Sequence, residues 1–186
     1  MKKFHPVCAC LLLLSGIALA QAAKPAEPQT VSQVLDRSVT NVENEFVPAA
    51  DTMPEDKYSF TPTTGEFKCV RSFEQQVKHV AAVNYILASA ILAEKSPVDT
   101  GGENGPDSIK SKADIIKYLK DSFAYLHKAA LSINEKTLVA SIKNPFGEGT
   151  ATRLALATGA LGHCFDHHGQ MVEYLRLNGI VPPASR

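Results

Sequence analysis

The sequence predicts an all-α fold, a four-helix bundle, and three observations support that prediction. Four segments of about 20 to 28 residues place apolar side chains at three- and four-residue steps, as amphipathic helices do. Stretches rich in Pro and Gly separate these segments. No convincing alternation of apolar and polar residues indicates a strand. Four amphipathic helices bury their apolar stripes by packing together, which is the architecture of a bundle.

The first helix is predicted over residues 31–50. Acidic residues lie opposite its apolar stripe, which is formed by Val34, Leu35, Val39, Val42 and Phe46. Met53-Pro54 ends this helix, because proline cannot continue the hydrogen-bond ladder. Residues 58–68 contain Pro62, Gly65 and a cluster of threonines, so they are predicted to form a loop.

The second helix is predicted from Ser72, a residue type suited to cap it, to about residue 95. His79 lies beside its apolar stripe and shares a face with Gln75, Gln76 and Val83. The core-facing positions of the stripe are Phe73, Val77, Val80, Ala81, Asn84, Leu87 and Ile91. Residues 96–110 hold two prolines and three glycines and are predicted to be an exposed connection.

The third and fourth helices are predicted over residues 111–133 and 150–177, with a loop over residues 134–149 between them. Asn178-Gly179 is a natural helix stop, and Pro182-Pro183 prevents extension beyond it. The predicted connections are longer than the two to eight residues usual in bundles, so we expect loops to shape one end of the molecule.

Residues 1–20 are predicted to be a signal peptide that is cleaved from the chain. Lys2 and Lys3 give a basic start, an apolar run follows, and Ala18-Leu19-Ala20 offers a small-residue cleavage site. The apolar run is too short to cross a bilayer. Residues 21–30 are then a flexible leader, and residues 31–186 are one bundle domain. We therefore expect an exported protein, periplasmic or secreted, without a membrane span.

The charge of the chain argues against a nucleic acid as its partner. The full sequence balances 19 basic against 19 acidic residues, and removing Lys2 and Lys3 with the signal peptide leaves 17 against 19. No basic stripe and no interleaving of basic and aromatic residues is visible. The partners that we expect are a small-molecule substrate or a thiol, and a homodimer is an open alternative to a monomer.

Two cysteines, Cys69 and Cys164, remain once residues 1–20 are removed. Cys69 lies ten residues before His79, and Cys164 is next to His163. If the two histidines share a metal ion, the sulfurs are too far apart for a disulfide, which needs Cα atoms within about 7 Å. We therefore expect free, partly buried thiols. A disulfide is the alternative, because an exported compartment would permit one.

The stretch from His163 to His167 is the most informative part of the chain. On a helix, this spacing places two imidazoles on one face, about 6 Å apart along the axis, as a shared metal ion requires. A third ligand must come from another helix, and His79 and His127 are the candidates. The alternative is an accidental pair of exposed histidines, since so short a motif arises by chance. The zincin motif is excluded, because no Glu follows His163.

The residues around the histidine pair are less specific. Gln170 lies on the same stripe and could hydrogen-bond a metal-bound water or orient a ligand, with capping or packing as the alternative. His168 falls on another face of the helix, and Asp166 is predicted to be a surface charge. The side chains predicted to be packed, solvated or at the rim of the bundle are Cys164, Glu173, Tyr174, Tyr85 and His127.

Several short motifs together resemble the DinB/YfiT-like family, over about residues 31–184. The matching positions are Met53-Pro54 with Tyr58, Ser72-Phe73 with Gln76, Val77 and His79, then His163, His167, Gly169 and Gln170, and finally Tyr174-Leu175-Arg176 before Gly179. The resemblance implies a four-helix bundle that holds one divalent metal ion through three histidines, here His79, His163 and His167. Where the family often has Arg or Tyr before the Gly-Gln pair, this chain has His168.

The resemblance also implies a class of function. Characterised relatives include thiol-dependent S-transferases and isomerases, so we expect a metal-dependent enzyme that is either such a transferase or a hydrolase. Three neutral imidazoles with open positions form a catalytic type of site, and nitrogen ligands suit zinc, nickel or iron. The alternatives are a non-catalytic bundle that binds a metal or a small ligand in the cell envelope, and a purely structural protein with incidental histidines.

Overall fold

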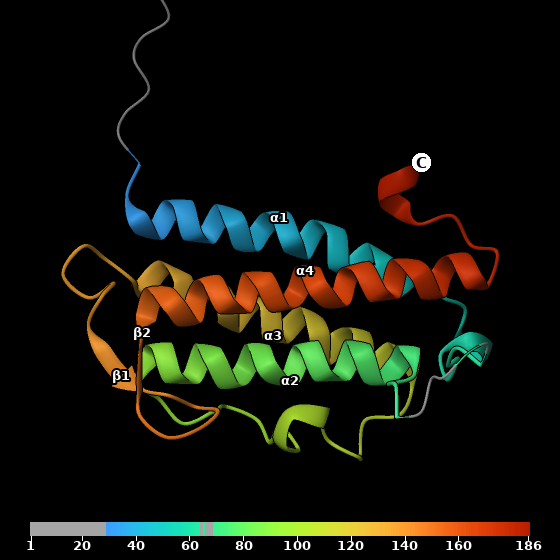
Figure 1. The fold of residues 1–186 in the computed structure, drawn as a ribbon, viewed down its shortest axis with the longest axis horizontal. Coiled ribbons are helices and arrows are strands. Elements are labelled where there is room, and N and C mark those ends of the chain that lie inside the picture. The colour runs from blue at the N-terminus through green and yellow to red at the C-terminus, as the bar shows by residue number, and fades with distance from the viewer. Residues whose placement is uncertain (1–28, 64, 66–68) are drawn as a thin grey trace, which may run out of the picture.

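The computed structural model describes residues 29–63, 65 and 69–186. Within these residues, four long helices run side by side (Figure 1). They are α1 (Val31–Thr52), α2 (Phe73–Leu92), α3 (Lys112–Ser132) and α4 (Arg153–Leu177). The predicted all-α, four-helix fold is therefore confirmed, and each helix begins and ends within a few residues of its predicted bounds.

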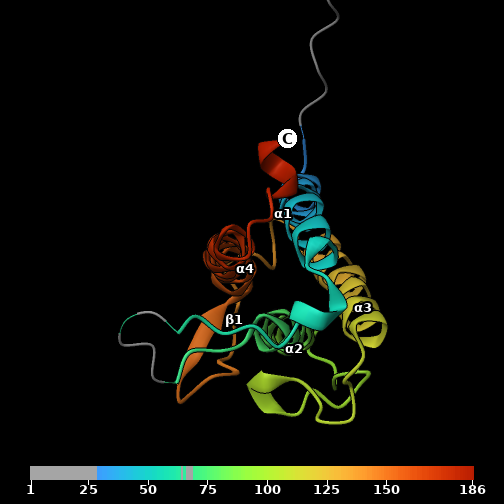
Figure 2. The same cartoon turned by 90° about the vertical axis from the view of Figure 1, so that its right-hand side faces the viewer.

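The order of the helices around the bundle explains the long connections. α3 packs against α1 and α2, and α4 packs against the other sides of the same two helices. Seen end-on, α1 and α2 therefore occupy opposite corners, as do α3 and α4 (Figure 2). Residues 53–72 and 133–152 must each cross an end of the bundle diagonally, which a short turn cannot do.

The local sequence defines where the helices begin. Thr30 and Ser72 cap α1 and α2, and in each case the residue three positions later, Gln33 or Gln75, bonds back to the cap. These reciprocal capping boxes satisfy amide groups that a helix start leaves without partners. α2 is the most enclosed helix, because 13 of its 20 residues are buried. A side chain on α2 is thus held rigidly by its neighbours.

The predicted absence of strands is wrong. β1 (Ser141–Lys143) and β2 (Thr150–Thr152) form an antiparallel hairpin in which Ile142 is paired with Ala151. Residues 150–152, predicted to open the fourth helix, belong to this hairpin, and α4 begins at Arg153 with Thr152 as its cap. Three-residue strands are too short to show an alternating pattern, although β-branched residues at these positions favour extended backbone.

The connection between α2 and α3 folds back over α2. It contains a 3-10 turn, η2 (Gly102–Asn104), between Gly101 and Gly105, both with positive φ angles of 59° and 78°. A Cβ atom on Gly105 would lie 2.9 Å from the Cβ of Lys78, so only glycine lets the loop approach α2 this closely. The close approach brings Glu103 to the face of α2 that carries His79.

The predicted signal peptide, residues 1–20, and most of the predicted leader lie outside the described residues. None of the helices within the described part is long and apolar enough to cross a membrane. Cys69 and Cys164 are both free, as predicted. The expected partial burial is wrong for each of them, because Cys164 is fully buried and Cys69 is exposed. The Cys164 thiol donates to Asn84 Oδ1 within the core.

Candidate metal centre

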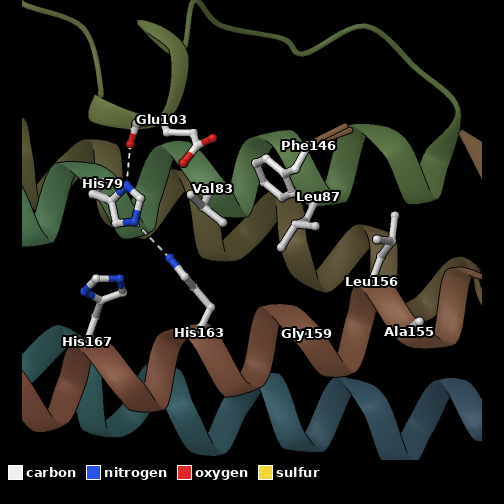
Figure 3. Close-up of a pocket in the computed structure, with 10 residues that line it drawn as sticks. All are labelled: His79, Val83, Leu87, Glu103, Phe146, Ala155, Leu156, Gly159, His163 and His167. Carbon is white, nitrogen blue, oxygen red and sulfur yellow. Dashed lines mark hydrogen bonds between the residues drawn. The ribbon is translucent and has the colours of Figure 1, made fainter. Parts of the chain in front are cut away.

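Three histidines from two helices meet between α2 and α4 (Figure 3). His79 comes from α2, and His163 and His167 come from successive turns of α4. One nitrogen of each ring lies within 4.8 Å of the others, and the Nε2 atoms of His79 and His163 are 3.0 Å apart. In the described part of the chain, this is the one group of three or more His, Cys, Asp or Glu side chains that could hold a metal ion.

A backbone oxygen determines which nitrogen of His79 carries the proton. His79 Nδ1 lies 2.5 Å from the carbonyl oxygen of Glu103, in the turn η2. Because a carbonyl can only accept a hydrogen bond, Nδ1 must carry the hydrogen and donate. The lone pair of a neutral His79 is then on Nε2, the atom that faces His163. This is the usual arrangement for a metal-ligating histidine, whose other nitrogen is held by an oxygen acceptor.

A chain of amides determines the proton position of His167 in the same way. Gln170 Nε2 donates to the carboxylate of Asp166 at 2.9 Å, and Gln76 Nε2 donates to Gln170 Oε1 at 2.8 Å. Gln76 Oε1 is left to accept from His167 Nδ1, at 2.5 Å. Since a carboxylate only accepts, Asp166 sets the direction of the whole chain. The lone pair of a neutral His167 is therefore on Nε2, away from Gln76.

His163 supplies the test of whether the site fits a cation. Its Nδ1 atom is buried and has no hydrogen-bond partner within the part of the chain that the structure describes, and its Nε2 atom faces the unprotonated Nε2 of His79. If Nε2 of His163 carries the hydrogen, it can donate to His79, but the buried Nδ1 is left without a donor among the described residues. If Nδ1 carries the hydrogen, that hydrogen has no acceptor among them, and the lone pairs of the two Nε2 atoms face each other. A cation shared by three imidazole nitrogens removes the repulsion between lone pairs. The residues present therefore fit a divalent metal ion.

The electrostatics of the site keep the histidines neutral. Burial, with the neighbouring His167 and His79, lowers the pKa of His163 to about 3. Burial is also the main cause that lowers the pKa of His167, to about 4. The pKa of His79 is lowered by burial too, although its bond to the Glu103 carbonyl opposes the shift. Neutral imidazole is the form that binds metals, so the site is ready to bind at neutral pH without first releasing protons.

The histidines lie at one end of a cavity of about 460 Å³ between α2 and α4. A site of this type, with three protein ligands and a cavity beside them, leaves room for water or a substrate at the metal. Glu103 also lines the cavity, and Figure 3 shows its carboxylate pointing toward the space below η2. The other lining residues are apolar or small, namely Val83, Leu87, Phe146, Ala155, Leu156 and Gly159.

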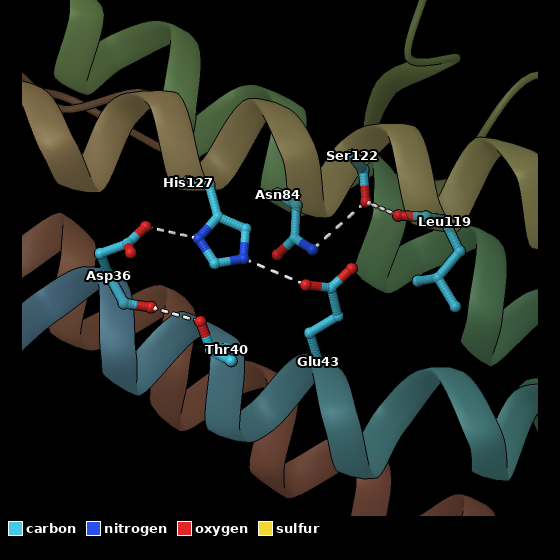
Figure 4. A network of polar contacts seen from close by, with 7 residues as sticks. All are labelled: Asp36, Thr40, Glu43, Asn84, Leu119, Ser122 and His127. Atoms are coloured by element: carbon cyan, nitrogen blue, oxygen red, sulfur yellow. Dashed lines mark hydrogen bonds and ion pairs between the residues drawn. The ribbon is translucent and has the colours of Figure 1, made fainter.

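His127, the other candidate for a third ligand, does not belong to this cluster. Figure 4 shows it between the carboxylates of Asp36 and Glu43. It is half-buried between α3 and α1, where Nδ1 lies 2.6 Å from Asp36 Oδ1 and Nε2 lies 3.0 Å from Glu43 Oε2. Both ring nitrogens must carry hydrogens to bond both carboxylates, which makes the ring an imidazolium. Burial lowers the pKa of His127, but the two carboxylates outweigh it and raise the pKa overall.

The remaining predicted residues fall largely where the helical wheel puts them. His168 is outside the cluster, with its ring 6.4 Å from that of Phe46. Tyr85 and Tyr174 are buried aromatic residues, and the Tyr174 hydroxyl donates to a backbone oxygen. Asp166 is exposed, as predicted for a surface charge, but it also anchors the amide chain that leads to His167.

Two residues of the site, Gln76 and Glu103, have no predicted role in the sequence. Gln76 precedes His79 by three positions, shares its helix face and is one of the positions that resemble the DinB/YfiT-like family, but these signals assign it no role. Glu103 orients His79 through its backbone carbonyl, which any residue possesses, so its residue type carries no signal of that contact. Gln170 contacts Gln76 and Asp166 rather than a histidine, so it acts on His167 indirectly.

The fold and the histidine cluster together define a helical bundle with a candidate site for one metal ion. Comparison with known protein families identifies the class: the family model of the DinB superfamily matches residues 39–171. The chain therefore belongs to the DinB superfamily, as its motifs predict.

Solved structures support the fold. A DinB-like protein from Bacillus cereus has 17% sequence identity and a TM-score of 0.63, and the match covers 83% of this chain and 97% of that one. A DinB-like protein from Bacillus subtilis has 21% identity and a TM-score of 0.60, with 78% and 92% covered. A conserved protein from Enterococcus faecalis has 17% identity and a TM-score of 0.63, with 81% and 98% covered. No significant match was found among curated proteins.

Proposed function

We propose that this protein is an exported, metal-dependent enzyme that hydrolyses a small molecule in the cavity beside its histidines. One observation supports the proposal above all: three neutral imidazoles converge at the end of an accessible cavity. A structural metal site is normally closed by four protein ligands, whereas this cluster offers three. The donor set suits zinc, nickel or iron.

The residues of the chain divide the work between binding and orientation. His79, His163 and His167 hold the metal ion, which when bound lowers the pKa of a water molecule and polarises a carbonyl group. The Glu103 carbonyl and the Gln76 amide keep two of these rings in the orientation that binding requires. The Glu103 carboxylate lines the cavity and is placed to accept a proton or a hydrogen bond from the substrate.

The cavity favours hydrolysis over transfer of a low-molecular-weight thiol. Many such thiols carry carboxylates, and a buried carboxylate needs a cationic partner. Among the described residues, no Lys or Arg lines the cavity, and Glu103, the one acidic residue in its lining, would repel a carboxylate. Water needs no such recognition. Export supports the same choice, because low-molecular-weight thiols are mainly cytosolic.

Export itself is proposed from residues 1–20, whose basic start, apolar run and Ala18-Leu19-Ala20 site are typical of a signal peptide. N-terminal sequencing of the protein from its native host tests this proposal. We expect the mature chain to begin at Gln21 or a few residues later. Recovery of the intact chain from the cytoplasm would contradict export.

Turnover of small esters and amides by the metal-loaded chain tests the reaction. We expect hydrolysis without added thiol, and loss of that hydrolysis in Glu103→Gln, with metal content unchanged because the backbone carbonyl remains. Glu94→Gln is the matched control, since Glu94 is exposed and pairs with Lys128 rather than the cavity. Turnover only in the presence of a thiol would contradict hydrolysis in favour of a transferase. Full metal loading without any turnover would show a binding protein instead of an enzyme.

A further inference from the structure

The cavity has a long shape that the three histidines do not explain. Beyond His79, Val83 and Leu87 follow on the same face of α2, and the span from His79 to Leu87 is eight residues, about 12 Å of helix. Leu156 and Ala155 line the facing part of α4 (Figure 3). We call this part of the cavity the apolar lane. A metal ion with one water molecule would occupy only its histidine end.

Gly159 lies in the lane, four residues before His163 and therefore on the same side of α4. A Cβ atom at this position would meet no other atom within 4 Å, so its missing side chain leaves open space. Glycine is among the least favourable residues inside a helix. α4 also contains Gly162, where a Cβ atom would likewise meet nothing, but Gly162 does not line the cavity.

The residues that line the lane favour an uncharged, apolar ligand. Of the described residues that line the cavity, Glu103 is the one ionisable residue apart from the histidines, and it lies at the histidine end. Phe146, in the turn of the hairpin, also lines the cavity, and Figure 3 draws its ring between the histidines and Leu156. Phe146 is 45% exposed, although an aromatic ring of its size is usually covered. A charged group in the lane would find no partner, whereas an apolar chain would cover these surfaces.

We propose that the apolar lane binds a substrate with a linear, uncharged hydrocarbon chain, whose polar end lies at the histidines. The chain would lie between α2 and α4, over Gly159, with Phe146 covering its middle and Leu156 at its far end. This assignment rests on the proposed function, which places the reaction at the histidine end. It names the substrate class: an ester, amide or related derivative that carries an aliphatic chain.

Binding of straight-chain 1-alkanols from butanol to octanol tests the lane without requiring turnover. Calorimetric titration of the purified chain should give an affinity that rises about fourfold per added methylene, the value expected for burial of each CH₂ group. The rise should stop once the chain is as long as the lane. An affinity that does not depend on chain length would overturn the proposal.

Two matched variants locate the bound chain. Gly159→Leu places a side chain in the lane and should weaken octanol binding at least tenfold, while Gly162→Leu puts the same side chain on the same helix outside the lane and should change nothing. Leucine is a better helix former than glycine, so both variants should fold, which a thermal melt checks. Equal octanol affinities in the two variants would refute the location.

The metal content of each sample separates this inference from the proposed function. Chain-length-dependent binding to a protein that holds no metal would support the lane and contradict the metal-dependent enzyme. Full metal loading together with alkanol binding that ignores chain length, or that Gly159→Leu leaves intact, would support the metal site and contradict the lane.

Discussion

Gln76 is the residue through which the bundle orients His167. Its side chain is 3% exposed, and its amide accepts from His167 Nδ1 while donating to Gln170. Gln76→Leu removes the acceptor at nearly constant size, so we expect metal affinity to fall roughly 10- to 100-fold, the usual effect of losing an outer partner of a ligating histidine. Gln76→Glu keeps an acceptor oxygen and should restore most of the affinity. Competition with a chelator measures the metal affinity of each variant. Equal affinities in the native protein, Gln76→Leu and Gln76→Glu would contradict the role of Gln76 in orienting His167.

The histidine pair of the site could be predicted from sequence, whereas its partners could not. His163 and His167 are four residues apart on one helix, and local geometry alone puts them on one face. The choice between His79 and His127 depends on which of their side chains faces the His163–His167 pair in the folded bundle, and residue spacing does not determine this. The resemblance to the DinB/YfiT-like family is what predicts His79. The role of Gln76 depends on its contact with Gln170 on another helix, 94 residues away in the chain.

At the scale of elements, the turn η2 holds the Glu103 carbonyl over His79, and Gly105 sets its distance from α2. Gly105→Ala should lower the free energy of unfolding by about 1 to 3 kcal/mol more than Gly102→Ala, the range for overpacking. Both positions have positive φ, but a Cβ atom on Gly102 meets nothing within 4 Å. Gly105→Ala should also weaken metal binding. Denaturant unfolding and a metal titration compare the two variants. Identical stability and metal affinity in Gly105→Ala and Gly102→Ala would contradict the role of Gly105 in the close approach of η2 to α2.

His127 on α3 forms ion pairs with Asp36 and Glu43 on α1, and the stabilisation from these ion pairs should depend on pH. The folded-state pKa of His127 is raised, so its stabilising effect is fully present below the unfolded pKa of about 6.5 and is lost as the pH rises through the folded value. We expect the native protein to be more stable than His127→Gln by roughly 1 kcal/mol or less at about pH 6, with the difference vanishing at alkaline pH. Urea unfolding at both pH values measures this. A difference that grows with pH would contradict it.

The long elements could be predicted from sequence because they repeat one pattern over many turns. α1 and α3 end within a few residues of their predicted bounds; α1 stops just before Pro54, whereas no Pro or Gly directly follows the end of α3 at Ser132. The hairpin of β1 and β2 could not be predicted, because three residues are too few to display a period. The sequence indicates the two diagonal connections only as unusually long loops. Loop length alone does not determine which position in the bundle the next helix occupies.

At the scale of the whole molecule, metal binding should stabilise the fold. The site joins α2 to α4 and forms only when the two helices pack, so the metal favours the folded state. At about 100 times its dissociation constant, a ligand adds about 2.7 kcal/mol, which for a domain of this size corresponds to roughly 5 to 10 °C in Tm. Removal of metal with a chelator should lower Tm by that amount, and calorimetry measures it. An unchanged Tm after complete metal removal would contradict the coupling.

The central claim is that His79, His163 and His167 form a binding site for one metal ion. Elemental analysis of purified residues 21–186, without added metal, tests it most directly. We expect about one equivalent of divalent metal per chain, almost none in His163→Ala, and an undiminished amount in His168→Ala, whose histidine is five residues further along α4 and outside the cluster. Absence of metal from the native chain, or equal metal in His163→Ala and His168→Ala, would contradict the claim.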